Sequence, residues 1–115
     1  MAVTENDLVD AMARRLGALG QPTRLALFCR IVQAGPAGHS VGELQAALGI
    51  PLSTLSFHLH KLVEVGLVSQ ERDGTSLRCC CDEAAVRATQ GFLREACCPP
   101  LPAPTGRRGA GGKVA

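Results

Sequence analysis

The spacing of apolar residues changes once along this sequence, at Gly66, and that change constrains the fold more than any other feature. Up to Gly66 apolar residues recur at helical intervals, whereas the next fifteen residues alternate around Asp73-Gly74. Asp-Gly between alternating runs is the strongest short signal for a β-hairpin, so residues 67–72 and 75–81 are predicted strands. A helical pattern returns over residues 82–97. The chain is therefore expected to be mainly α with one small β-hairpin.

Four helices are expected before the hairpin, over residues 5–19, 22–35, 40–48 and 52–65. Pro22 suits the first turn of the second helix, and Ser40 with Glu43 forms a capping box for the third. A tight turn through Gly49 and Pro51 separates the third helix from the fourth, which is the layout of a helix-turn-helix. With the hairpin as a wing, the predicted fold is a winged helix-turn-helix in the order α-α-α-α-β-β-α.

Length and composition limit the functions that this fold can serve. At 115 residues the chain has room for one domain, expected over residues 1–98, and a Pro/Gly/basic tail over 99–115 that is expected to be disordered. An enzyme with separate cofactor and substrate lobes is excluded. The absence of Trp and Tyr argues against stacking platforms for single-stranded nucleic acid. No segment is apolar enough to span a membrane, and the charged start lacks a signal peptide, so a cytoplasmic protein is expected.

The distribution of charge along the sequence indicates that any nucleic-acid binding must come from a local surface. The net charge is +2, but Arg107, Arg108 and Lys113 belong to the tail, which leaves nine basic against ten acidic residues in 1–98. The fourth helix supplies such a surface, because short polar side chains at its start can approach base edges and Lys61 can reach phosphate. The candidate DNA contacts on this helix are Ser53, Thr54, Ser56, Phe57, His58, His60 and Lys61. In the wing, Arg72 and Arg78 can contact the neighbouring DNA backbone or minor groove. Phe57 has two open roles, contact with a thymine methyl group or packing against the preceding helix.

Three segments carry a family resemblance that covers roughly residues 6–98. They are Leu19-Gly20-Gln21-Pro22-Thr23-Arg24-Leu25, Leu55-Ser56-Phe57-His58-Leu59-His60-Lys61-Leu62 and Gly66-Leu67-Val68. In this order and spacing, with the Asp-Gly wing, the chain resembles the ArsR/SmtB family of metalloid- and metal-responsive repressors. The resemblance implies a homodimer, formed through the first and last helices, that binds an operator in double-stranded DNA and leaves it when an inducer binds. It does not imply an enzyme, and three scattered histidines offer no convincing partner for a cysteine nucleophile.

Six cysteines are many for a chain of this length, and five of them form two clusters, 79–81 and 97–98. Adjacent cysteines close no useful loop, so reduced thiols that bind a soft ion or take part in redox chemistry are expected. Cys29, on the second helix, is expected to be a small core residue.

The resemblance narrows the position of a sensing site. The family's familiar arsenic site uses thiols on the first helix of the helix-turn-helix, where residues 41–45 contain none, and its zinc sensors use Asp and His on the last helix, where no His occurs. The remaining pattern is similar to members whose arsenic site lies at the end of the last helix. It uses Cys97 and Cys98 with a third thiolate from Cys79, Cys80 or Cys81.

Cys79, expected at the end of its strand, is the predicted third ligand, and Cys81 is the expected buried thiol. Three thiolates suit As(III) or Sb(III) as inducer, two suffice for an organoarsenical, and no permanent cofactor is expected. A last helix of about sixteen residues separates Cys79 from Cys97 by more than about 20 Å, which predicts a site shared between two subunits. Thiol oxidation and soft-metal (Zn or Cd) sensing by the same fold remain the alternatives.

Overall fold

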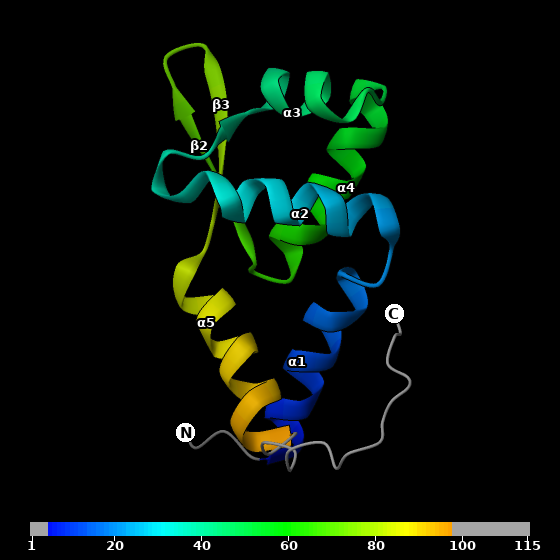
Figure 1. The fold of residues 1–115 in the computed structure, drawn as a ribbon, viewed down its shortest axis with the longest axis vertical. Coiled ribbons are helices and arrows are strands. Elements are labelled where there is room, and N and C mark those ends of the chain that lie inside the picture. Colours follow the sequence, from blue (N-terminus) through cyan, green and yellow to red (C-terminus); the bar gives the residue numbers. More distant parts are fainter. Residues whose placement is uncertain (1–4, 98–115) are drawn as a thin grey trace, which may run out of the picture.

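The computed structural model describes residues 5–97 and confirms a mainly helical winged helix-turn-helix (Figure 1). The tail expected over residues 99–115 lies outside these residues. Among residues 5–97, none of the helices has the length and apolar character needed to cross a bilayer. The elements are α1 (Glu5–Ala18), α2 (Pro22–Ala34), the 3-10 turn η1 (Gly35–Ala37), β1 (His39–Ser40), α3 (Val41–Leu48), α4 (Leu52–Glu64), β2 (Val68–Asp73), β3 (Ser76–Cys81), α5 (Glu83–Gly91) and the π-helical turn η2 (Phe92–Cys97).

Side-chain caps explain where the helices begin. The predicted capping box of α3 is confirmed, because the Glu43 N–H donates to Ser40 Oγ at 3.1 Å and the Ser40 N–H donates to Glu43 Oε1 at 2.9 Å. Asp82 Oδ1 accepts from the Ala85 N–H at 3.0 Å and starts α5. The last helix reaches Cys97 as expected, but its final segment, η2, is π-helical.

The sheet has three antiparallel strands in the order β1-β3-β2, one more than the sequence predicted. β2 and β3 form the expected wing around Asp73-Gly74, with Gly74 at a positive φ of 66°. The added strand β1 is too short to show a period, and it depends on Gly38. A Cβ built at Gly38 would lie 2.5 Å from the carbonyl oxygen of Cys79, so only glycine lets this segment approach β3 and pair His39 with Cys79.

The core lies between the helices α2, α3 and α4 and the inner face of the sheet. The apolar side of α4 faces this core, since Leu55, Leu59 and Leu62 recur at helical spacing and are buried. The other buried members of the cluster are Leu27, Ile31, Leu44, Leu67, Val68, Cys79 and Ala85. This packing fixes one side of α4 and turns its other side outward.

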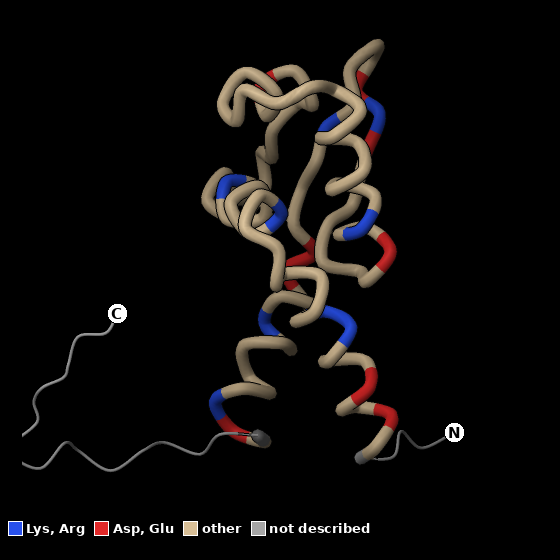
Figure 2. The backbone as a smooth tube through the Cα atoms, turned by 90° about the vertical axis from the view of Figure 1, so that its right-hand side faces the viewer, with Lys and Arg blue, Asp and Glu red and all other residues tan. Residues whose placement is uncertain are grey.

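The terminal helices, defined as α1 together with α5 and η2, extend away from this core in the same direction (Figures 1 and 2). Met12 is the one residue of α1 in the buried hydrophobic set, while Leu8 and Leu16 on the same predicted apolar face stay 37% and 36% exposed. A hollow of about 430 Å³ lies between α1 and the last helix, lined by Leu8 and Met12 on one side and by Phe92 on the other. The apolar face of α1 is thus only partly covered within one chain.

Candidate DNA-binding interface

The outward side of α4 carries most of the polar residues that the sequence assigned to DNA. Ser53, Ser56 and His60 are exposed at helical spacing, and Thr54 and Lys61 are half-exposed beside them. Small hydroxyl side chains near the start of a helix let its backbone approach base edges closely. We refer to α4 as the recognition helix from here on.

His58 corrects the sequence analysis, which placed it on the exposed polar surface. It is buried, with 7% of its surface exposed, and its Nδ1 accepts a hydrogen bond from Arg24 Nε at 3.3 Å. Burial, with a smaller contribution from the Arg24 charge, lowers the pKa of His58 below its ordinary value. The neutral ring therefore carries its proton on Nε2. The helical period turns residue 58 toward α2, so His58 is no base contact in this conformation.

Phe57 is 53% exposed, and the cationic groups of Arg24 and Lys61 lie over its ring. The Arg24 Cζ lies 5.8 Å and the Lys61 Nζ 5.4 Å from the ring centroid, and the His58 ring meets Phe57 edge-on at 5.4 Å. Of the two roles expected for Phe57, packing against the preceding helix stays a prediction, because Arg24 belongs to α2 and the helix that precedes α4 is α3. Its exposed half leaves contact with a thymine methyl group as a prediction.

Glu64, at the end of the recognition helix, is the exposed partner of two side chains. His60 Nε2 lies 3.1 Å from Glu64 Oε2, and Lys61 Nζ lies 3.9 Å from Glu64 Oε1. Exposed pairs of this kind contribute little stability, about 0–1 kcal/mol. Lys61 can therefore exchange Glu64 for a DNA phosphate at small cost.

The two arginines of the wing differ in their surroundings. Arg72 is exposed on β2, as a contact to the DNA backbone requires. Arg78 donates through Nη1 to the carbonyl oxygens of Ala37 at 2.7 Å and Gly38 at 3.4 Å, and its Nε lies 3.8 Å from Asp73 Oδ2. Arg78 thus holds the segment before α3 against the wing, and a DNA contact from it stays a prediction.

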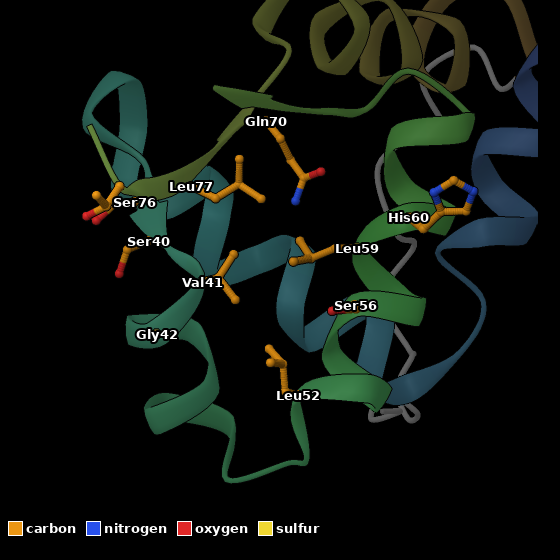
Figure 3. Close-up of a pocket in the computed structure, with 11 residues that line it drawn as sticks. Ser40, Val41, Gly42, Leu52, Ser56, Leu59, His60, Gln70, Ser76 and Leu77 are labelled. Carbon is orange, nitrogen blue, oxygen red and sulfur yellow. The ribbon is translucent and has the colours of Figure 1, made fainter. Parts of the chain in front are cut away.

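A groove of about 680 Å³ runs between the recognition helix, the start of α3 and the wing (Figure 3). Ser56 and His60 line it from one side, and Ser40 and Gln70 from the others. Thr75 and Ser76, at the tip of the wing, complete a lining rich in hydrogen-bonding groups of the kind that contact sugar and phosphate. The sequence analysis missed the lining residues outside α4, although the hydroxyls after Asp73-Gly74 were a local signal.

The strand cysteines reverse their predicted roles. Cys79 is fully buried, with Gln70 Nε2 3.8 Å from its Sγ, and burial raises the pKa of its thiol. Cys80 and Cys81 are half-buried, and Cys29, expected in the core, is exposed. The expectation that Cys81 is the buried thiol is therefore wrong, and the burial of Cys79 argues against its predicted role as third ligand. Cys79 lies within β3 on the face that packs into the buried core cluster, whereas Cys81 is the last residue of the strand and only packs against that cluster.

The terminal cysteines lie at the limit of the described chain. The backbone of η2 reaches Cys97, while the Cys97 side chain and all of Cys98 lie outside the described residues. Among the residues described, no three side chains of His, Cys, Asp or Glu gather closely enough to hold a metal ion. A site at Cys97 and Cys98 is therefore a matter for proposal.

The fold, the exposed face of α4 and the wing beside it define a winged helix-turn-helix DNA-binding protein. Residues 19–71 match the family model described as a helix-turn-helix domain. The HTH-type transcriptional regulator YgaV of Escherichia coli K12 is 32% identical over 90 residues, which cover 78% of this chain and 89% of that protein.

Two solved structures are similar over most of their length. An ArsR-like transcriptional regulator from Rhodococcus sp. RHA1 has a TM-score of 0.65 at 25% identity, over 74% of this chain and 77% of that one. The homodimeric winged helix-turn-helix DNA-binding domain of Mb0332 from Mycobacterium bovis also has a TM-score of 0.65, at 27% identity over 78% and 82% of the two chains. The chain belongs to the ArsR-like family of winged helix-turn-helix transcriptional regulators.

Proposed function

We propose that this chain is a homodimeric repressor that places one recognition helix of each subunit in the major groove of an operator. The observation that carries the proposal is the outward polar face of α4, which lies next to the groove and the wing. Two recognition helices about one DNA turn apart, ~34 Å, would meet two half-sites on one side of the duplex. The protein acts by binding DNA in the cytoplasm and has no enzymatic activity.

The dimer forms through the terminal helices. Their apolar residues Leu8, Val9, Leu16 and Leu93 are between 36% and 46% exposed, and the hollow between α1 and the last helix can receive side chains of a second chain. Covering such a surface is favourable at roughly 25 cal/mol per Å² of apolar area. The similar domain of Mb0332 is homodimeric, which supports a homodimer but does not identify the helices that form it.

The inducer is trivalent arsenic or antimony, bound by the thiolates of Cys97 and Cys98. The third thiolate comes from Cys80 or Cys81, because both are half-buried while Cys79 is enclosed in the core. The last helix, residues 83–97, separates β3 from Cys97 by about 20 Å. One ion therefore joins Cys97 and Cys98 of one subunit to β3 of its partner, and binding shifts the dimer to a form with low affinity for DNA.

An operator-release titration tests this function. A duplex selected from a random library with the wild-type protein is labelled, and its complex is titrated with arsenite, antimonite, phenylarsine oxide, zinc, cadmium and peroxide. We expect arsenite and antimonite to release the duplex from the wild-type protein. The Cys97→Ser, Cys98→Ser double variant should bind the duplex normally and resist release, whereas Cys29→Ser, the matched exposed thiol, should behave like the wild type.

The other outcomes separate the alternatives. Release by peroxide alone, restored by a thiol reductant, would indicate an oxidation sensor, and release by zinc or cadmium alone would indicate a soft-metal sensor. Arsenite release that survives in the double variant would refute the assignment of Cys97 and Cys98. If the library yields no preferred duplex, the DNA-binding proposal fails at its first step.

A further inference from the structure

Two arginine side chains connect α1 to the inward side of the recognition helix. Met12 is the only residue of α1 in the buried hydrophobic set, so these polar contacts add to a small apolar attachment. Arg15 extends from α1 and Arg24 from α2, and both are half-buried. Neither was among the DNA contacts expected from the sequence.

Arg15 reaches the end of the recognition helix. Its Nε donates to the carbonyl oxygen of Val65 at 3.1 Å, and Val65 is the C-cap residue of α4. A cation at this position also interacts favourably with the negative end of the helix dipole. Its Nη1 donates to Thr89 Oγ1 of α5 at 3.5 Å, and the Thr89 hydroxyl donates in turn to the Ala85 carbonyl at 2.8 Å. One guanidinium thus joins α1, α4 and α5.

Arg24 forms a second connection near the middle of the recognition helix. Its Nη1 donates to the carbonyl oxygen of Ala18, the last residue of α1, at 3.0 Å, and its Nε donates to His58 Nδ1 at 3.3 Å. Its own backbone N–H is held by the Gln21 side chain at 2.8 Å. A planar guanidinium suits this position because two of its N–H groups meet two acceptors on different helices.

The two contacts lie seven residues apart on the chain, at His58 and Val65, which is about two helical turns. Contacts at two levels on one side of a helix resist both its rotation about its own axis and its tilt. Because each contact leads back to α1, the orientation of the recognition helix is tied to the helix that the proposed dimer uses. The distance between the two recognition helices on DNA then depends on both arginines.

We propose that Arg15 and Arg24 are positioning residues that hold the recognition helix at a fixed orientation to α1 and thereby set the spacing of half-sites that the dimer accepts. The inference rests on the proposed dimeric DNA-binding function. It assigns these arginines a role through α4 and not a contact with phosphate.

The test uses full-length Arg15→Gln and Arg24→Gln, with Arg14→Gln and Arg30→Gln as matched controls, since Arg14 and Arg30 are exposed on the same two helices. Binding is measured by fluorescence anisotropy over a salt series. The probes are the duplex selected with the wild-type protein, versions with one base pair added or removed between its half-sites, and a scrambled duplex. Circular dichroism melting reports folding, and sedimentation reports the dimer.

We expect Arg15→Gln and Arg24→Gln to bind the selected duplex about tenfold more weakly, the size of effect typical of a lost hydrogen bond from a charged group. Binding to the scrambled duplex should match the controls, the salt slope should stay unchanged, and discrimination against the altered spacings should fall. Arg15→Lys and Arg24→Lys should weaken binding to the selected duplex equally, because one ammonium group does not reproduce the planar set of N–H donors of a guanidinium. These lysine variants also carry the test if a glutamine variant fails to fold.

Three results would overturn the inference. The first is wild-type discrimination in the arginine variants. The second is an equal loss on selected and scrambled duplexes with a salt slope smaller by about one, which would make the arginines phosphate contacts. The third is full rescue by lysine. A folded, dimeric wild-type protein with no duplex preference would instead refute the proposed function, and the inference with it.

Discussion

The helix-turn-helix body, residues 22–81, and the terminal helices bury their apolar residues to very different extents. In the body, α2, α3, α4 and the sheet cover one another, and Leu27, Ile31 and Leu44 have no exposed surface. In the terminal helices, Leu8 and Leu93 stay more than a third exposed within one chain. The comparison teaches that the body closes its own core, although Leu25, Leu52 and Phe57 stay exposed on its surface, whereas the terminal helices bury few apolar side chains within one chain.

The two regions also differ in how their helices are joined to α4. α2 contributes Leu27 and Ile31 to the core that packs against the recognition helix. α1 is joined to it through the hydrogen bonds of Arg15 and Arg24. Hydrogen bonds depend on direction, whereas apolar burial does not. The polar connection therefore suits a helix whose orientation must be set.

The largest expected effect is the loss of stability caused by a cavity in the helix-turn-helix body. Leu27→Ala should lower the free energy of unfolding by about 3 kcal/mol, because a fully buried leucine is lost and its cavity cannot collapse completely. Urea denaturation followed by circular dichroism, at one protein concentration, measures the change. Leu25→Ala on the same helix, where the side chain is 44% exposed, is the control and should cost much less. Similar losses in both variants would contradict the described core.

The second prediction concerns the terminal helices. The double variant Leu8→Gln, Leu93→Gln should raise the dissociation constant of the dimer by about tenfold or more, since each substitution removes apolar area from the expected interface. Sedimentation equilibrium measures the constant. Leu25→Gln removes a comparable exposed leucine from the body and should leave the dimer unchanged; an equal weakening there would place the interface elsewhere.

The sequence predicted the body well and its tertiary details less well. Period and turn chemistry identify the apolar stripe of α4, the capping box at Ser40 and the hairpin around Asp73-Gly74, because these signals are local. The strand β1 was missed because two residues show no period, and its pairing depends on the close approach at Gly38. The burial of Cys79 in the core cluster is likewise a tertiary contact that the local pattern does not show.

In the candidate DNA interface, too, the sequence predicts the features that depend on local spacing and misses the contacts between distant residues. The outward position of Ser53 and Ser56 follows from the helical period alone. The inward position of His58 also follows from the period, because it shares the buried side of α4 with Leu55 and Leu62. Its hydrogen-bond donor Arg24, thirty-four residues earlier in the chain, is what sequence spacing does not reveal. Arg78 likewise has acceptors at Ala37 and Gly38, about forty residues earlier, which the sequence of the wing does not reveal.

The third prediction separates base contacts from phosphate contacts on the recognition helix. Ser56→Ala with His60→Ala should weaken binding to the selected duplex by about tenfold and leave binding to a scrambled duplex nearly unchanged. Lys61→Gln should weaken both and reduce the salt slope by about one. Anisotropy titrations across a salt series measure these effects. Equal losses on both duplexes for the Ser56 and His60 variant would show that this face does not recognise bases.

The smallest expected effect is on pH dependence. Because the pKa of His58 is lowered from 6.5 in the folded protein, the unfolded chain binds a proton more readily, and the stability present above pH 6.5 is lost as pH falls toward the folded value. Urea denaturation between pH 7 and 5 should show a steeper loss for the wild type than for His58→Gln. The lowered pKa of Glu43 acts below 4.5, outside this range. Identical slopes would contradict the buried neutral His58.

The most direct test of the central claim, that the terminal helices complete the molecule as a DNA-binding dimer, is the mass of its complex with DNA. Sedimentation velocity of the selected duplex with the wild-type protein should give two chains per duplex. The Leu8→Gln, Leu93→Gln variant, at the same concentration, should leave most of the duplex unbound. One chain per duplex at full affinity, in either protein, would contradict the account.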